Sequence, residues 1–168
     1  SGRRYGLQIT LRPTDYINFS IESSNEYKPG SMQWVGIVED ENGPNIIYSN
    51  VLRKQTNTEL RLNVAFSSKM TFEAYYQPFK VEMDYKDYNR LVREKSFDLE
   101  PYNYDTDKDF KIDNRVGTFV FRWEYLPGSL IYAVYNLNDN NYYSYQDGKW
   151  DPSQSNSLFI KIDRFFQL

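Results

Sequence analysis

The sequence predicts an all-β fold, in the form of an antiparallel transmembrane β-barrel segment of about eight strands. Three observations lead to this class. Apolar and polar residues alternate with a period of two along much of the 168-residue chain. No apolar run approaches the ~20 residues that a membrane helix needs. Short turns alternate with long polar connections, as in outer-membrane barrels with short periplasmic turns and long external loops.

The N-terminal part of the chain contains most of the expected strands. They cover residues 5–11, 17–21, 33–38, 46–53, 60–66 and 70–76. Within each strand, apolar side chains fall at every second position, so that they share one face. Pro13-Thr14-Asp15 and Ser67-Ser68-Lys69 supply short turns between two of the strand pairs, since Pro, Asp and Ser favour turn geometry.

The most informative segment is the expected hairpin at residues 119–135. Pro127-Gly128 supplies its tight turn, because Pro fixes φ and Gly accepts φ > 0. Large apolar residues occupy one face of its first strand, while Val120, Arg122 and Glu124 occupy the other. A last strand at 158–168 has the same alternation. In a membrane barrel the apolar face meets lipid and the charged face meets the lumen.

The spacing of turns and loops predicts the direction of each strand. Short turns lie at 13–15, 67–69 and 127–129, and long polar connections lie at 82–115 and 137–156. All short turns fall at one end of the sheet, together with the last residue, if 28–57 contributes an even number of strands. The expected organisation is one domain, 1–168, without an internal boundary. The first residues lack the apolar stretch of a signal peptide, which predicts a mature or internal part of a longer protein.

Composition excludes several kinds of chemistry. The chain has no Cys and no His, so thiol nucleophiles, disulfides, serine triads and the usual zinc sites are excluded. A net charge of −3 without a basic stripe gives no reason to expect nucleic acid as a partner. Nothing positions Glu59, Glu73 or Glu124 as an acid–nucleophile pair. We therefore expect neither an enzyme nor a cofactor.

Two sets of residues are candidates for function, and strand phase places them on opposite faces. The residues expected to face lipid are Leu60, Leu62, Val64, Phe119, Phe121, Trp123, Leu158, Ile160 and Ile162. The polar residues expected to face the lumen are Glu59, Arg61, Glu73, Arg122, Glu124, Lys161 and Asp163. The lumenal set either binds or selects a solute, or lines the barrel through cross-strand ion pairs, and the second alternative is favoured.

Two further patterns lie in the expected loops. Asp105, Asp107 and Asp109 have calcium-loop spacing, but Phe110 and Val116 occupy the positions where an EF-hand needs Gly and Glu. A solvated acidic loop is therefore favoured, and no metal site is predicted. Tyrosines are abundant in the loops, where they serve either to stack on sugars or to hold the loops folded over the barrel mouth.

Three stretches resemble one uncharacterised family of large Bacteroidetes-type surface proteins. They are TNTELRLNVAFSSKMTFEAYYQPF (56–79), FRWEYLPGSLIYAVYN (121–136) and SLFIKIDRFFQL (157–168). The opening strand pair, QITLRPTDYINFSIESS, is also similar. Proteins of this family carry an N-terminal carbohydrate-binding-like sandwich followed by a C-terminal outer-membrane β-barrel. The resemblance implies that this chain is the C-terminal part of such a barrel, and it implies no activity.

The sequence therefore predicts a barrel component in the outer membrane of a Gram-negative bacterium, connected with binding or passage of a surface glycan or solute. Expected partners are membrane lipid and the remaining barrel strands, from the same protein or from a cleaved partner chain, besides other proteins of an outer-membrane complex. Open strand edges are not tolerated in lipid, which is why further strands are required. The alternative is a soluble all-β module that binds a ligand or carbohydrate, with the apolar face buried in protein.

Overall fold

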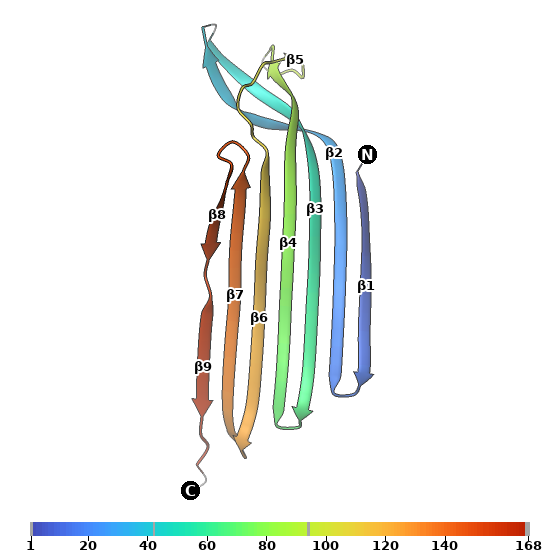
Figure 1. Cartoon of the computed structure of the whole chain (residues 1–168), viewed down its shortest axis with the longest axis vertical. Coiled ribbons are helices and arrows are strands. Elements are labelled where there is room, and N and C mark those ends of the chain that lie inside the picture. The colour runs from blue at the N-terminus through green and yellow to red at the C-terminus, as the bar shows by residue number, and fades with distance from the viewer. Residues whose placement is uncertain (1, 42, 94, 167–168) are drawn as a thin grey trace.

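The computed structural model describes residues 2–41, 43–93 and 95–166, which form one nine-stranded antiparallel sheet (Figure 1). The strands are β1 (Arg3–Thr14), β2 (Ile17–Asp40), β3 (Gly43–Ser67), β4 (Met70–Leu91), β5 (Leu99–Pro101), β6 (Phe110–Leu126), β7 (Ser129–Ser144), β8 (Lys149–Gln154) and β9 (Ser157–Asp163). The predicted all-β, antiparallel class is confirmed. No helix within the described ranges is long and apolar enough to cross a membrane.

Neighbours in sequence are mostly neighbours in the sheet. The order is β1-β2-β3-β4-β6-β7, and both β8 and β9 pair with β7 at its two ends. The short β5 adds to the upper part of β4. Within the described residues, β1 has no partner on its outer side, nor do β8 and β9, so this sheet is not closed into a barrel.

The predicted segregation of turns is present. The β1–β2, β3–β4 and β6–β7 turns lie together at the lower end of Figure 1, where β9 also ends. The long connection between β4 and β6 lies at the upper end, together with the short β2–β3 and β7–β8 turns. Residues 28–57 contribute the upper halves of β2 and β3, which is the even number of strands that the prediction required. We call these two ends the turn end and the loop end.

The predicted strand boundaries were wrong at the loop end. β4 continues to Leu91, β6 begins at Phe110, and β7 and β8 cover most of the expected loop at 137–156. The segments expected at 33–38 and 46–53 are continuous with β2 and β3. Backbone hydrogen bonding needs no apolar side chain, so a ladder can continue through residues that are polar on both faces. The last strand ends at Asp163, and Leu168 lies outside the described residues.

The buried hydrophobic side chains of the described residues lie near the loop end. Val51, Val81 and Met83 are buried, with Phe79, Tyr85, Phe110 and Ile112 packed against them; we call this group the upper cluster. The lower half of the sheet is a single layer, with no second sheet or helix of the described residues against either face.

The β6–β7 turn is fixed by its own side chains. Gly128 has a φ of 74°, which an L side chain rarely adopts. Its N–H donates to a carboxylate oxygen of Glu124 at 2.9 Å. The buried Ser129 hydroxyl accepts the N–H of Phe165 at 3.0 Å, which ties the segment after β9 to this turn. The turn therefore anchors the end of β9 as well as joining β6 to β7.

Candidate membrane-facing surface

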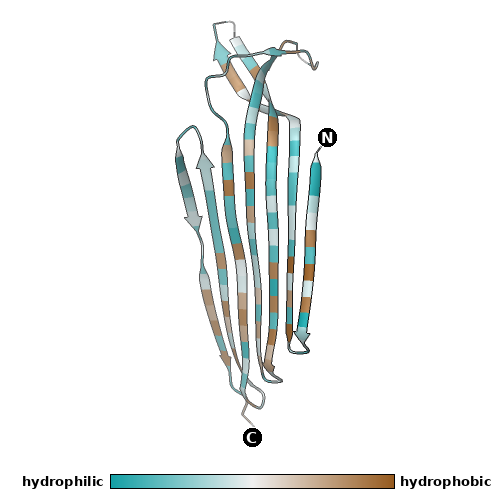
Figure 2. Cartoon of the chain, turned by 45° about the vertical axis from the view of Figure 1, so that its right-hand side comes forward, coloured by the Kyte–Doolittle hydropathy of each residue, from teal (hydrophilic) through white to brown (hydrophobic). Residues whose placement is uncertain are grey.

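Antiparallel register aligns the apolar residues in rows that cross the sheet. One row runs Leu11, Phe19, Leu62, Ala74, Phe119, Tyr135 and Leu158, each paired with the next. We call this side of the sheet the belt face. Its apolar belt consists of Ile9, Leu11, Ile17, Phe19, Ile21, Leu60, Leu62, Val64, Met70, Phe72, Ala74, Tyr76, Phe119, Phe121, Trp123, Ile131, Ala133, Tyr135, Leu158, Ile160 and Ile162. Figure 2 shows hydrophobic residues recurring along the lower parts of the strands.

All nine residues predicted to face lipid lie on the belt face, because each is in register with another member of the belt. Ile160 and Ile162 at the edge are 58% and 65% exposed, and Trp123 further inside is 39% exposed. No other element of the described chain covers them. Leu158 at the same edge is 65% exposed, and the other five are partly shielded by their neighbours within the same layer.

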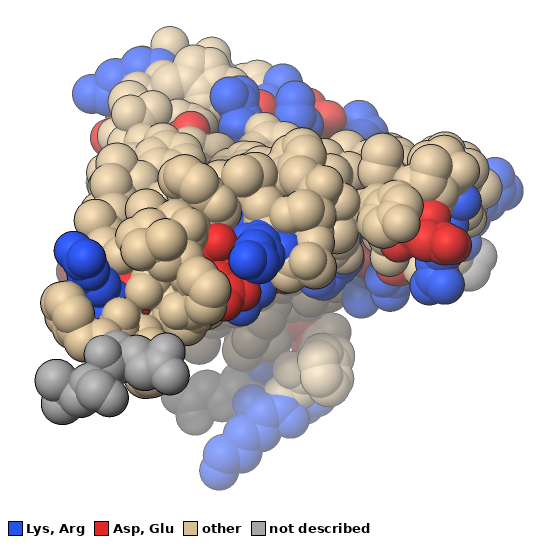
Figure 3. Space-filling model, turned by 90° about the horizontal axis from the view of Figure 1, so that it is seen from below, with Lys and Arg blue, Asp and Glu red and all other residues tan. Residues whose placement is uncertain are grey.

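The seven residues predicted to face the lumen lie on the other side, which we call the opposite face. Arg61, for example, is in register with Ser20 and Tyr75, and its guanidinium lies over the Tyr75 ring at 4.6 Å. Arg122 donates from Nε to the Tyr132 hydroxyl at 3.2 Å. Seen from the turn end, acidic and basic side chains lie in small groups among uncharged residues (Figure 3).

The ion pairs of the opposite face do not follow the predicted cross-strand arrangement. Arg61 pairs with Glu59 at 3.3 Å and Lys161 with Asp163 at 2.8 Å, so each pair lies within one strand. Residues two apart in a strand point to the same side, which brings their charges together. Glu73 is in register with Asn63 and Val120, neither of which is charged. The carboxylate of Glu124 accepts the N–H of Gly128 in the β6–β7 turn.

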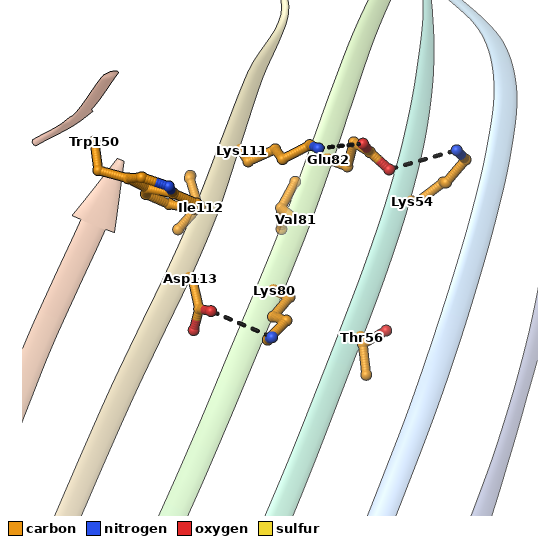
Figure 4. Close-up of a pocket in the computed structure, with 9 residues that line it drawn as sticks. All are labelled: Lys54, Thr56, Lys80, Val81, Glu82, Lys111, Ile112, Asp113 and Trp150. Carbon is orange, nitrogen blue, oxygen red and sulfur yellow. Dashed lines mark hydrogen bonds and ion pairs between the residues drawn. The ribbon is translucent and has the colours of Figure 1, made fainter. Parts of the chain in front are cut away.

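A set of charges that the sequence analysis missed lies on the belt face directly above the belt. Lys54, Glu82 and Lys111 are aligned across β3, β4 and β6, with distances of 3.4 Å and 3.1 Å from the two lysines to Glu82. In the next row, Lys80 contacts Asp113 at 3.2 Å (Figure 4). With Arg115, these residues are the charged band. Glu82, Lys111, Asp113 and Arg115 were expected in the loop at 82–115, although charges two apart in sequence, at 80 and 82 and at 111 and 113, were a signal of strand structure.

The charged band borders a shallow open depression of about 410 Å³, with Trp150 at one side. Hydrogen bonding from Lys111 lowers the pKa of Glu82 below its usual value, and the charge of Lys54 acts in the same direction. The pKa of Lys111 is raised, chiefly by its hydrogen bond to Tyr145 and then by Glu82. At neutral pH Glu82 and Lys111 are therefore both charged, and they form an ion pair on the surface.

The two faces exchange polarity at the level of Gly117. Below that level, toward the turn end, the belt face is apolar and the opposite face carries Arg122 and Glu124. Above it, the belt face carries the charged band, and the opposite face carries the upper cluster. The pairing of β4 with β6 has no register shift between Met70 and Met83. The change of polarity on each face therefore results from the order of residues along the strands and not from a β-bulge.

The predicted acidic loop holds its carboxylates apart. Asp109 accepts the N–H of Tyr85 at 2.6 Å, and Asp107 accepts the N–H of Asp109 at 2.9 Å. Asp105 accepts from the Asn103 side chain at 3.2 Å. Burial raises the pKa of Asp109, which is half-buried rather than solvated. Within the described ranges, no three Asp or Glu side chains converge as metal ligands would.

Tyrosines that were expected in loops pack on one another near the loop end. The rings of Tyr88 and Tyr104 are 4.8 Å apart, and Tyr143 lies 5.0 Å from Tyr145 and 5.2 Å from Trp150. Tyr88, Tyr143 and Trp150 lie in β4, β7 and β8 rather than in loops, so these contacts join strands to one another and to the adjoining connections.

The fold and this surface define a single-layer antiparallel β-sheet protein with an uncovered apolar belt. The chain belongs to the family described as "Domain of unknown function (DUF5916)", which matches residues 2–165. No curated protein and no solved structure shows significant similarity to it. Because the family description assigns no activity, the geometry of the sheet has to support the functional conclusion.

Proposed function

We propose that this chain is the C-terminal part of a transmembrane β-barrel in the outer membrane of a Gram-negative bacterium. The apolar belt faces the hydrocarbon core, and the opposite face lines the lumen. The turn end lies in the periplasm and the loop end outside the cell. The chain is a structural component of this barrel rather than an enzyme.

The observation that carries this proposal is the exchange of polarity between the faces at one level of the sheet. A soluble sheet keeps one face in contact with a core along its length. A strand that leaves a bilayer meets lipid and then water on the same outward face, so this face changes from apolar to charged. The belt and the charged band follow that order on β3, β4 and β6.

The height of the belt fits a bilayer. On β6 the belt members Phe119, Phe121 and Trp123, together with the flanking Gly117 and Tyr125, cover residues 117–125, which is at the lower limit of the ~9–11 residues that a tilted strand needs to cross the hydrocarbon core. Aromatic side chains mark both margins, with Trp123 and Tyr125 near the turn end and Tyr76 and Tyr135 toward the loop end. Such residues favour the boundary between lipid and water.

The opposite face supports a polar lumen. Arg61, Glu73 and Arg122 lie on it at the level of the belt, where a lumen would be the only source of water. A lumen of this kind supports the passage or binding of a polar solute such as a surface glycan, once further strands complete the barrel.

Single-cysteine variants test the proposal cleanly, because the chain has no cysteine of its own. Phe119→Cys on the belt and Thr118→Cys beside it on the opposite face are each labelled with an environment-sensitive fluorophore in membranes. Lipids that carry a quencher on the acyl chain should quench the label at position 119 strongly. The label at position 118 should be quenched mainly by water-soluble iodide.

Arg115→Cys provides the matched control, because it lies on the belt face but within the charged band. Its label should respond to iodide and only weakly to the lipid quencher. Equal lipid quenching at all three positions, or none at position 119 in a protein that stays soluble without detergent, would contradict the proposal. The second result would favour a soluble binding module.

A further inference from the structure

The first and the last strand positions of the sheet run in the same direction. All neighbouring strands are antiparallel, and the sheet has seven positions: β1, β2, β3, β4, β6, β7 and the one that β8 and β9 share. Because this number is odd, β1 and β9 both run from the loop end to the turn end (Figure 1).

Both of these strands have an open side. All residues of β1 are exposed, with Leu7 at 64% and Leu11 at 53%, and most of β9 is exposed as well. Their outer N–H and C=O groups have no strand partner among the described residues. The next step rests on the proposed function, since backbone groups at the depth of the belt must be hydrogen-bonded when they lie in hydrocarbon.

A second copy of this sheet cannot complete an antiparallel barrel. In a membrane, two copies share one orientation, with their belts and charged bands at the same levels. Strand β1 of one copy would then meet β9 or β1 of the other copy, and either pairing would be parallel. An inverted copy would be antiparallel, but its charged band would lie on the wrong side of the bilayer.

We infer that both open edges are filled by strands from outside the described residues that run from the turn end to the loop end. Since strand direction alternates around a closed antiparallel barrel, the number of additional strands is odd. The strand beside β1 has apolar residues on its outward face level with Ile9 and Leu11. It becomes polar level with Arg3, where the belt has ended.

Photo-crosslinking in membranes containing the full-length protein tests the direction of this strand. The amino acid p-benzoylphenylalanine replaces Tyr5 in one variant and Leu11 in another, and mass spectrometry locates each crosslink. Because β1 runs toward the turn end, an antiparallel partner runs the other way. The residue crosslinked to position 11 should therefore come earlier in the partner's sequence than the residue crosslinked to position 5.

The same probe at Ile21 is the control, because its neighbours are known to be Ile9 and Leu60. The reverse order of crosslinks, or crosslinks from β1 to β1 or β9 of another copy, would overturn the inference. Probes at Gln8 and Thr10, on the opposite face, repeat the measurement if the first variants do not assemble. An even number of additional strands in an experimental structure of the full-length protein would also overturn it.

This test is independent of lipid contact. If the quenching experiment failed while the crosslinks had the expected order, the proposed membrane location would be wrong and the strand direction would stand. If the belt were quenched by lipid but the crosslinks had the reverse order, only the inference about the edges would fail.

Discussion

Glu82 and Lys111 face each other on β4 and β6, and their side chains form an ion pair of 3.1 Å directly above the apolar belt. Lys54 contacts the other carboxylate oxygen of Glu82 at 3.4 Å, so one acid joins three strands. A short turn joins β3 to β4, whereas a long connection separates β4 from β6. The charged band therefore marks the level at which the belt face changes from apolar to polar.

Replacement of Glu82 by Gln should lower the free energy of unfolding by less than about 1 kcal/mol at neutral pH, because the pair is partly exposed. The pKa of Glu82 is lowered in the fold, so its stabilisation is present above the unfolded value of about 4.3 and is lost as pH falls through the lower folded value. Chemical denaturation of both proteins at pH 7 and pH 3 should show a smaller difference at pH 3 than at pH 7. A pH-independent difference would assign the effect to packing.

Replacement of Phe121 by Arg should prevent or weaken folding into a bilayer, since a cation at mid-depth on a lipid-exposed strand costs about 2–4 kcal/mol. Val120→Arg is the matched control, because Val120 lies on the opposite face in register with Glu73. Urea titration of folding in phospholipid vesicles gives both values. Equal costs for the two variants would contradict the assignment of the faces.

Gly128→Ala should destabilise the β6–β7 turn by more than Gly148→Ala destabilises the β7–β8 turn. Both glycines have positive φ, which costs an L residue about 1–2 kcal/mol. Only at Gly128 would a Cβ also meet a neighbour, Phe165, at 3.1 Å, whereas nothing lies within 4 Å at Gly148. Thermal denaturation of both variants measures the difference in stability. Equal losses of stability would show that Phe165 can move away from the added Cβ without cost.

Alkaline pH should loosen the packing of the 102–109 segment against β4. Burial raises the pKa of Tyr88 to about 12, and the Tyr104 ring lies 4.8 Å from it. A raised pKa gives stabilisation that is complete below the unfolded value of about 10 and is lost as pH rises through the folded value. Hydrogen exchange of this segment should therefore accelerate between these values beyond the intrinsic increase. Tyr88→Phe should remove that excess, and its persistence would exclude Tyr88 as the cause.

The alternation of apolar and polar residues, together with the turn residues, was sufficient to predict the lower half of the sheet. The Phe119–Tyr135 hairpin could be predicted because Pro127-Gly128 and the alternation on each side specify turn and faces together, and the structure pairs these two residues with ring centroids 6.1 Å apart. The charged band could not be predicted as a site. Its members come from β3, β4 and β6, and the register of strands separated by a long connection depends on pairing that no local pattern encodes. Strand ends at the loop end were missed because the apolar residues of β4 and β6 change face there, and because the upper part of β7 is mostly polar on both faces.

The β4–β6 ladder has no register shift, and the β6–β7 ladder has none between Phe110 and Glu124, so the two halves of the molecule differ in how well they tolerate length changes. Inserting one residue directly after Gly117 would turn Phe119 and Phe121 to the other side and bring Arg122 to the belt, because the side-chain period is two. The same insertion at 103–106 would lengthen a connection that has no strand partner. Evolution of this protein should therefore vary the loop end by insertion and deletion, and the belt by substitution alone.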